Sequence, residues 1–295
     1  MHPVKKSAGQ CMSEPAPILF NPEELDDFVW KIPTTAIGRN FDYRDRTSST
    51  NDLALEAGKN GGAHGKVFLA EVQHAGRGRR GRSWESPPGL SLLFSILIRP
   101  RNLDPMLLGW IPLAAGLGAA NGLKRCAPVK LCLKWPNDLV IPSAAEPGWR
   151  KLGGILCESV LGTGDETFVV VGIGLNINQR ASHLPEIPKS PPTSLLLETG
   201  QNSDRRAVLS AVLEEIEKAF VFLEESSALP ALRSAIEITL NQTWRGRTIS
   251  LRSPATDNGP LFSGLFAGLD DFGRIRIRER SGERTFADAE IIGLA

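Results

Sequence analysis

The chain has 295 residues, of which 41% are hydrophobic and 23% charged, so it can bury a substantial core in one or two domains. Its formal net charge of +1 argues against a dedicated nucleic-acid binder, because such domains carry a general or one-sided excess of lysine and arginine. The sequence shows neither a run of about 18 apolar residues nor a signal peptide, so we expect no membrane span and a cytoplasmic location.

The cysteines and histidines lack the spacing of a metal site. Cys11, Cys126, Cys132 and Cys157 contain no C-x-x-C pair, and the four histidines form no H-E-x-x-H motif. We therefore expect no metal site and no disulfide, with the cysteines buried as small apolar residues in a reducing compartment.

Residues 1–43 are expected to form an N-terminal arm. Five prolines interrupt it, and the segment NPEELDDFVWKI predicts one short helix that starts near Pro22. The arm is too short and too rich in proline for a three-helix DNA-reading domain.

The segment RTSSTNDLALEAG predicts a helix that is capped by Ser49 or Thr50 and ends at Gly58, with Leu53, Ala54 and Ala57 facing inward. A Ser-Ser-Thr-Asn run before apolar residues is also what an ordinary capped helix would show, so this motif alone does not separate a cap from a binding site.

Two buried strands flank the arginine- and glycine-rich segment Gly76–Trp84, GRGRRGRSW. KVFLAEVQHAG predicts a strand over Val67–Val72 that delivers Gln73 at its end, and GLSLLFSILIRP predicts the next strand. Glycine supplies backbone freedom and arginine supplies fork-shaped donors for phosphate or carboxylate, so we predict a mobile cationic loop held on a sheet. Taken alone, the motif also fits a solvated loop or a disordered tract that touches nucleic acid.

The middle of the chain predicts a helix, a hairpin and two further strands. The Ala/Gly-rich stretch from Asp104 to Cys126 predicts a helix buried across the sheet. VKLCLKWPNDLVI predicts two strands joined at Pro136, with the KWPND side chains close together; a hairpin without chemistry is the alternative. KLGGILCESV and TFVVVGIGLNIN predict strands whose glycines allow close approach of a ligand, and GIGLN lacks the third glycine and the helix of a Rossmann fingerprint.

The last third of the chain predicts two helices, over Ser203–Glu225 and Pro230–Leu240, followed by short strands. The turn signals DNGP and DDFG indicate a small β-barrel from about Trp244 onward. Because about 50 residues are near the lower limit for independent stability, this barrel is expected to pack on the main domain.

Five stretches occur in the order found in biotin protein ligases: SSTND, QHAGRGRRGRSW, KWPND, KLGGILCE and VGIGLNIN. From about residue 46 to its end, the chain resembles this family in its monofunctional form without a DNA-binding domain. The resemblance implies an α+β fold. A catalytic domain over 44–240, with a mixed β-sheet and packed helices as in class II synthetases, would precede a small SH3-like β-barrel over 241–295.

The resemblance also implies an activity. Ligases of this family activate biotin with ATP and Mg²⁺ to biotinyl-5′-AMP, and then transfer biotin to a lysine of the biotin carboxyl carrier domain of a carboxylase. The implied partners are biotin, ATP and that carrier domain, with no operator DNA, no membrane and no tightly bound cofactor. The oligomeric state stays open, with a homodimer as one option.

The resemblance assigns site residues in three groups. The first step joins two anions, a carboxylate and an α-phosphate, so cations are needed to offset their repulsion. The residues implied for catalysis are Lys151, Arg77, Arg79, Lys134 and Asp138. Those implied for biotin are Ser49, Thr50, Asn51, Gln73, Arg77, Gly78, Arg79, Lys151, Gly153 and Gly154. Those implied for ATP are Trp84, Lys134, Asn137, Gly172, Gly174 and Asn176.

Two alternatives remain at this point. A lipoate or octanoate protein ligase resembles the same catalytic fold, but it would carry an Arg-Arg-x-Ser-Gly-Gly-Gly stretch that this sequence lacks. A non-enzymatic nucleic-acid binder would use the Arg/Gly loop and the small barrel, but it would need interleaved aromatic residues that are absent here.

Overall fold

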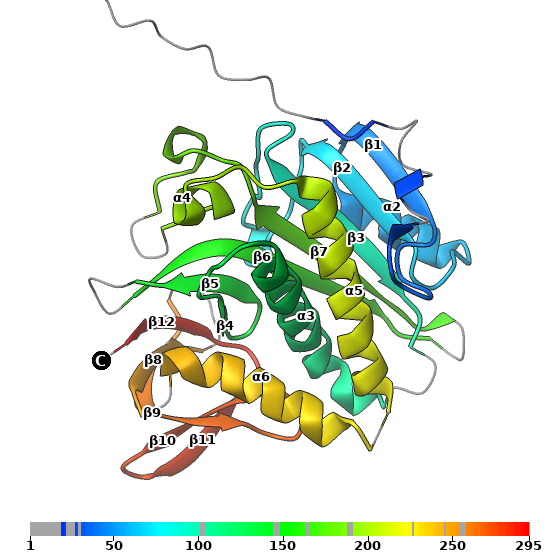
Figure 1. Cartoon of the computed structure of the whole chain (residues 1–295). Helices are drawn as coiled ribbons and strands as arrows, with labels where there is room; N and C mark the ends of the chain where they lie inside the picture. Colours follow the sequence, from blue (N-terminus) through cyan, green and yellow to red (C-terminus); the bar gives the residue numbers. More distant parts are fainter. Residues whose placement is uncertain are drawn as a thin grey trace, which may run out of the picture.

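The computed structural model describes residues 19–21, 27–28, 31–100, 104–143, 148–162, 166–187, 191–225, 227–244, 246–253 and 258–294 (Figure 1). The larger sheet contains β1 (Phe41–Thr47), β2 (Val67–Gln73), β3 (Ser91–Ile98), β4 (Cys132–Lys134), β5 (Asp138–Pro142), β6 (Trp149–Val160) and β7 (Phe168–Asn176). The helices are α2 (Thr50–Lys59), α3 (Ile111–Cys126), α4 (Leu195–Thr199), α5 (Arg205–Glu224) and α6 (Leu229–Trp244), with 3-10 turns η1 (Arg79–Gly81), η2 (Pro105–Trp110) and η4 (Ala181–His183).

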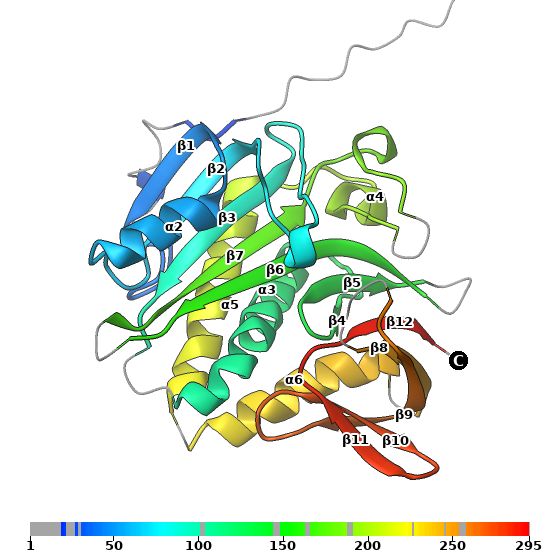
Figure 2. The same cartoon turned by 180° about the vertical axis from the view of Figure 1, so that it is seen from behind.

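The larger sheet is mixed and has helices on both faces. Its strand order is β1-β2-β3-β7-β6-β5-β4; β1 runs parallel to β2, and the other neighbouring pairs are antiparallel. Helices α3 and α5 cover one face, and α2 lies on the other (Figures 1 and 2). The predicted fold class is confirmed, including the strand that precedes the cationic loop, the strand that follows it and the KWPND hairpin.

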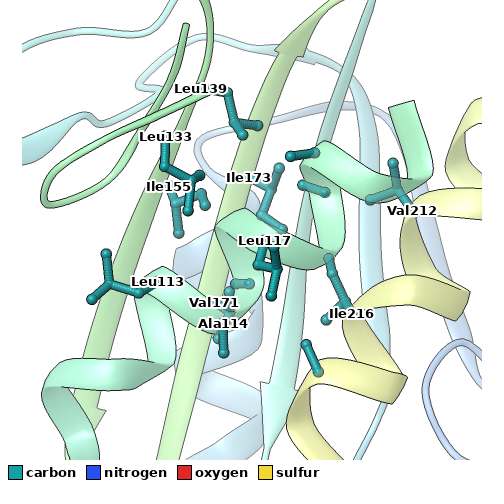
Figure 3. Packing of buried hydrophobic residues seen from close by; sticks show 14 of the residues in the cluster. Leu113, Ala114, Leu117, Leu133, Leu139, Ile155, Val171, Ile173, Val212 and Ile216 are labelled. Carbon is teal, nitrogen blue, oxygen red and sulfur yellow. The ribbon is translucent and has the colours of Figure 1, made fainter. Parts of the chain in front are cut away.

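The strands at the centre of the sheet are apolar on both faces because each face is covered. In β7, Val169 and Val171 belong to the main core under α3 and α5, whereas Phe168 and Val170 belong to a second cluster under α2. Side chains alternate between the two faces of a strand, so one run of valines serves both clusters. Figure 3 shows α3 packed into this main core.

Helices α3 and α5 pack closely because α3 is rich in glycine. A Cβ atom added at Gly118 would lie 2.6 Å from the Cα of Ile216, and one added at Gly122 would lie 2.6 Å from the Cα of Val212. The predicted role of small residues in this helix is thus confirmed. The stretch Pro105–Cys126 is long and apolar enough to cross a membrane by length and composition, yet 67% of its apolar window is buried inside the protein, which agrees with the predicted helix buried across the sheet.

The described part of the N-terminal arm is packed on the main domain. Ile32 and Ile37 are fully buried in the main core, and the amides of Thr35, Ala36 and Ile37 donate to the carboxylate of Glu217 on α5. Since β1 begins at Phe41, the predicted arm boundary at residue 43 falls inside a strand. The helix predicted from Pro22 lies largely outside the described residues.

The C-terminal strands form a separate antiparallel sheet that packs on the main domain, as predicted. Its strands are β8 (Thr248–Arg252), β9 (Leu261–Leu269), β10 (Ile275–Glu279), β11 (Gly282–Phe286) and β12 (Glu290–Leu294), in the order β11-β10-β9-β8-β12. The indole nitrogens of Trp110 and Trp135 donate to the carbonyls of Asp271 and Gly273, each at 2.9 Å. The domain boundary predicted at 240/241 falls within α6, so this helix belongs structurally to both parts.

The three cysteines in the described part of the chain, Cys126, Cys132 and Cys157, are free, and Cys11 lies outside it. Cys132 is buried, but Cys126 is exposed at the end of α3, which corrects the expectation that these residues are buried. Burial raises the pKa of the Cys157 thiol to about 12, so this group stays protonated at neutral pH.

Candidate functional site

A cleft opens on the α2 face of the larger sheet, where it is lined by the start of α2, the cationic loop and the strands β6 and β7. The cationic loop, with its short cyan helical turn beside β6, lies on this face in Figure 2. Thirteen residues that were predicted from the sequence line the cleft: Ser49, Thr50, Asn51, Gln73, Arg77, Gly78, Arg79, Trp84, Asn137, Lys151, Gly154, Gly172 and Gly174. The fold therefore brings together most of the predicted site.

One end of the cleft is formed by neutral polar groups at the start of α2 and the end of β2. The backbone amide of Thr50 donates to Gln73 Oε1 at 2.7 Å, and the Thr50 hydroxyl lies 3.1 Å from the same oxygen. Since this oxygen is already engaged, the Gln73 amide nitrogen is the group that would donate to a ligand.

Asn51 is held by two partners that the sequence motifs did not single out. Ser95 Oγ lies 2.6 Å from Asn51 Oδ1, and Asn51 Nδ2 donates to Glu158 Oε2 at 2.7 Å. These contacts fix the orientation of the amide, because its oxygen faces a hydroxyl and its nitrogen faces a carboxylate. Glu158 ends the motif KLGGILCE, and an acid at the pocket face of this strand was the available signal.

Helix α2 starts at the predicted residue, but the side chains at its start line the cleft instead of capping the helix. Ser49 occupies the N-cap position without a side-chain capping hydrogen bond, and Thr50 and Asn51 are buried. Gly58 does not end the helix, which continues to Lys59. A Cβ atom at Gly58 would lie 2.3 Å from the ring of Phe168, so close packing on β7 is the reason for this glycine.

The cationic loop folds back on itself as a small hairpin. The amide of Trp84 donates to Gly76 O at 2.9 Å, and the amide of Gly78 donates to Arg82 O at 2.6 Å. Arg77 and Ser83 form an antiparallel β-bridge between them. The sequence predicted no regular structure here, because the pairing covers only a few residues and encloses the turn η1.

Two loop arginines face the cleft. Arg77 lies 2.7 Å from Asp52 and 3.0 Å from Glu158, and Arg79 donates to Asn137 Oδ1 at 3.5 Å. Burial lowers the pKa of the Arg79 guanidinium group, and the positive charge of the adjacent Arg80 lowers it further. Both side chains bring positive charge to one side of the cleft, since guanidinium groups stay protonated in proteins.

Lys151 lies at the start of the glycine pair in β6. Its Nζ is 2.6 Å from Asp138 Oδ1 and 5.5 Å from the centre of the Trp84 indole ring. Its backbone is held by the segment 191–193. The Lys151 amide donates to the Pro191 carbonyl, and the Thr193 amide donates to the Lys151 carbonyl. The ammonium group is therefore held in place from both its backbone and its charged end.

The KWPND hairpin supplies the carboxylate that pairs with Lys151. Asp138 also lies 4.0 Å from Lys134, which is buried below the cleft and sits 4.5 Å from the Trp149 ring. Burial alone raises the pKa of Asp138, but the charges of Lys151 and Lys134 outweigh it and lower the pKa below its usual value. Burial lowers the pKa of Lys134.

The glycines of β6 and β7 form the floor of the cleft beneath Trp84. A Cβ atom at Gly174 would lie 2.6 Å from the indole, and one at Gly154 would lie 3.3 Å from both Trp84 and Lys151. A Cβ at Gly172 would lie 1.9 Å from Asn51 Oδ1. Side chains at these positions would fill the cleft or displace the groups that line it.

Four predicted residues do not line the cleft. Gly153 faces the opposite side of the sheet, where an added Cβ would lie 2.7 Å from Leu175, because neighbouring strand residues point to opposite faces. Asn176 is buried and donates to Thr193 O at 2.9 Å, next to the Lys151 clamp. Lys134 and Asp138 lie behind Lys151.

The cleft thus combines a neutral hydrogen-bonding end with a cationic side formed by Arg77, Arg79 and Lys151. Such a site suits an uncharged polar ring at one end and negatively charged groups at the other. Among the described residues, no group of three His, Cys, Asp or Glu side chains could hold a metal ion by itself.

Residues 43–176 match the Biotin/lipoate A/B protein ligase family. The chain is similar to proteins named biotin–[acetyl-CoA-carboxylase] ligase: 31% identical to that of Mycobacterium tuberculosis over 80% of this chain and 82% of that protein, and 31% identical to that of Paracoccus denitrificans over 83% and 97%. It is also 28% identical to the bifunctional ligase/repressor BirA of Bacillus subtilis, over 88% of this chain and 76% of that protein.

Solved structures give the same result. The fold matches the biotin protein ligase of Aquifex aeolicus in complex with biotin and ATP, with a TM-score of 0.69 and 28% identity over 87% of this chain and 98% of that one. The likeness therefore extends over most of this chain and nearly all of the solved one.

Proposed function

The chain belongs to the Biotin/lipoate A/B protein ligase family, and we infer from this membership and from its cleft that it is a biotin protein ligase. It uses ATP to convert biotin to biotinyl-5′-AMP, and it then transfers biotin to a lysine of the biotin carboxyl carrier domain of a carboxylase. The observation that carries this assignment is a single cleft that is lined both by neutral amide and hydroxyl groups and by two arginines and a lysine.

The neutral end of the cleft fits the ureido ring of biotin. This ring presents one carbonyl acceptor and two N–H donors, and the cleft offers the Gln73 amide together with hydroxyl groups of Ser49 and Thr50. A ureido group buried without these partners would cost about 1–3 kcal/mol per unpaired group, which gives the site its selectivity. Asn51 supports this end through its contacts with Ser95 and Glu158.

The cationic side fits the biotin carboxylate and the α-phosphate of ATP. The carboxylate attacks phosphorus, a bond to the α-phosphate forms, and pyrophosphate leaves with the electron pair of the broken P–O bond. Lys151, Arg77 and Arg79 offset the repulsion between the two anions and stabilise the charge that develops on the transferred group. Asp138 and the clamp after Pro191 keep the Lys151 ammonium group directed to this place.

Trp84 and the glycine floor are proposed for the adenosine part of ATP. The indole offers a flat face for stacking, and Gly174 lets it lie close to β7, since an added Cβ would be 2.6 Å from the ring. Gly172, implied by the resemblance for ATP, instead lies against Asn51, so we propose that it serves the biotin end. Asn176 would act indirectly, because its amide holds the segment that clamps Lys151. Lys134 would act in the same indirect way through Asp138.

Mg²⁺ is proposed to enter with ATP. Magnesium is usually held by substrate phosphates, water and one or two carboxylates, so it does not need a cluster of three protein ligands. Asn137, which lines the cleft near Arg79, has an oxygen-bearing side chain that would fit this role, whereas Asp138 lies behind Lys151 and would act through that lysine. The ion would neutralise phosphate charge.

The adenylate is a mixed anhydride that water hydrolyses, so it must be shielded until the acceptor lysine arrives. The cationic loop over the cleft is proposed to provide this shield.

We further propose that residues 44–240 form the catalytic domain and that residues 241–295 form the C-terminal domain. The proposed macromolecular partner is the carrier domain of a carboxylase, and the proposed location is the cytoplasm.

Substrate-dependent exchange of labelled pyrophosphate into ATP tests this function. We expect exchange with biotin, and little with lipoate or octanoate at equal concentration. Exchange with lipoate while biotin is silent would overturn the assignment. Adding an apo carrier domain should consume the adenylate and label one lysine, which mass spectrometry would locate.

A further inference from the structure

The arginines of the cationic loop divide into two groups. Arg77 and Arg79 line the cleft, whereas Arg80 and Arg82 do not and instead contact the C-terminal sheet. Arg80 lies 2.7 Å from Asp288, and Arg82 donates to both carboxylate oxygens of Glu290, at 2.9 and 2.8 Å. Weaker contacts join Arg80 to Glu290 at 3.4 Å and Arg79 to Asp288 at 3.5 Å. One loop therefore faces ligand groups on one side and two carboxylates on the other.

The two carboxylates stand on a rigid base. Glu290 begins β12, which pairs with β8 opposite Arg252, and the carbonyl of Asp288 accepts from Ser253 Oγ at 2.7 Å. Ala289, between them, is fully buried. Because the sheet fixes these acids, the loop is the partner that gains order when the ion pairs form.

The backbone of the loop is also adapted to this contact. Arg80 has a φ of 60°, in the left-handed region that residues other than glycine adopt rarely. Such a conformation persists only where surrounding contacts compensate for it. Here the contacts are the ion pairs of Arg80 with Asp288 and Glu290.

We propose that Asp288 and Glu290 are positioning residues that hold the cationic loop over the cleft through Arg80 and Arg82. The C-terminal sheet then acts on the active site without touching the substrate, because it determines how often the loop opens. The consequence for retention of biotinyl-AMP rests on the proposed function, whereas the consequence for loop order does not.

The ion pairs also separate the roles of the four arginines. Arg80 and Arg82 are directed to Asp288 and Glu290, whereas Arg77 and Arg79 line the cleft, so the loop arginines that face the ligand are Arg77 and Arg79. If Arg80 and Arg82 bound phosphate instead, removal of the two acids would leave the loop of the ligand-free protein unchanged.

Hydrogen–deuterium exchange on the ligand-free protein tests loop order. The amides of Gly78 and Trp84 are hydrogen-bonded within the loop, so their exchange reports its opening. We expect Asp288→Asn/Glu290→Gln to accelerate this exchange about fivefold, which corresponds to about 1 kcal/mol, the upper range for exposed ion pairs. Glu283→Gln is the matched control, because Glu283 pairs with Arg278 within the same sheet. Exchange equal to wild type in the double variant would overturn the proposal.

Charge reversal provides the second test. Arg82→Glu alone should accelerate loop exchange, and Arg82→Glu combined with Glu290→Arg should restore much of the protection, a rescue that a general loss of stability would not show. About 0.5 M salt should accelerate exchange in wild type and have little effect on the double amide variant, because the pairs are exposed to screening. A double reversal no better than the single variant would contradict the pairing.

Release of preformed biotinyl-AMP connects the loop to function. In Asp288→Asn/Glu290→Gln we expect adenylate to form and to leave the enzyme about fivefold faster than from wild type, in proportion to loop opening. Faster exchange with unchanged release would overturn the control of retention. If wild type forms no adenylate at all, the proposed function fails, and the exchange rates of the ligand-free protein still decide whether the two acids hold the loop.

Discussion

At the scale of single residues, the charges beside the cleft depend on one another. Lys151 is close to the glycine floor and to Trp84, and its ammonium group contacts Asp138. Asp138 is in turn shared with Lys134. The buried Asp138 carboxylate thus determines the position of the Lys151 ammonium group, which faces the ligand. We therefore expect substitution of Lys151 mainly to affect catalysis and substitution of Asp138 also to affect stability.

Replacement of Lys151 by alanine should lower the rate of biotinyl-AMP formation by about 100-fold or more, because a preorganised donor at a developing charge contributes about that much. Single-turnover formation of the adenylate measures it. Lys130→Ala, at an exposed lysine of the same chain, is the control. The double variant Lys151→Ala/Asp138→Asn avoids an unpaired buried carboxylate, and adenylate formation at the wild-type rate in either variant would refute the role of Lys151.

The pH dependence of stability should reveal Asp138. Its pKa in the folded protein is lowered below the unfolded value of about 3.9, so the unfolded state binds more protons in acid. The stabilisation is complete above the unfolded value and is lost as the pH falls through the folded value. We therefore expect Asp138→Asn to be less stable than wild type at neutral pH, with a difference that shrinks below about pH 4.

Urea unfolding of both proteins between about pH 7 and pH 3 measures this difference. Glu186→Gln, at an exposed acid, should show no such trend. A difference in unfolding free energy that stays constant with pH would mean that the carboxylate is not held in its charged form by the two lysines.

At the scale of elements, β7 serves two purposes because its two faces differ. On one face, Val171, Ile173 and Leu175 complete the main core, and on the other, Gly172 and Gly174 leave the cleft open. The run VGIGLN thus alternates large residues for α3 and α5 with glycines for the ligand. Close approach, rather than backbone freedom, explains these glycines.

Gly172→Ala should damage the neutral end of the cleft. The new methyl group would lie 1.9 Å from Asn51 Oδ1, and Asn51 is held by Ser95 and Glu158, so the amide must move or the strand must shift. We expect a loss of about 1–3 kcal/mol in stability and a KM for biotin raised about tenfold. Biotin titration and urea unfolding measure the two effects.

Gly293→Ala is the matched control, because it changes a strand glycine whose added Cβ meets no atom within 4 Å. It should leave biotin binding and stability near wild type. Equal behaviour of the two variants would show that the contact between β7 and Asn51 is not important.

At the scale of the whole molecule, the two sheets share one hydrophobic core. Buried residues from the larger sheet, from α6 and from the C-terminal sheet belong to the same cluster, including Trp244, Ile249 and Ile275. Trp135 of the KWPND hairpin donates to Gly273 O in the C-terminal sheet. We therefore expect the two parts to unfold together.

Trp135→Phe should test this junction. The change keeps an aromatic ring and removes the donor to Gly273, which leaves a buried carbonyl unpaired at a cost of about 1–3 kcal/mol. Trp149→Phe is the matched control, because the Trp149 indole nitrogen is buried without a hydrogen-bond partner among the described residues. Thermal unfolding should show one transition in both variants, shifted to lower temperature more in Trp135→Phe; an equal shift would contradict the importance of this contact.

Some features of this protein follow from its sequence alone. The runs around Phe68, Phe94 and Val170 are apolar at most positions, which predicts strands buried on both faces, and α5 shows its helical period plainly. These signals are local, because they depend on the spacing of side chains along one element. The same is true of the five motifs that resemble biotin protein ligases, which predicted thirteen of the residues that line the cleft.

Other features were decided only by tertiary structure. The sequence places Gly153 and Gly154 side by side, but the sheet turns one to the core and the other to the cleft. Ser95, Asp288 and Glu290 lie outside the five motifs, and Glu158 ends one of them without a role that the motif assigns. The roles of these residues depend on contacts with residues between 44 and 210 positions away. Such contacts depend on how strands and domains pack, and no local pattern encodes them. For this reason the sequence predicts a cationic loop, but the fold determines which arginines face the ligand and which are held by the C-terminal sheet.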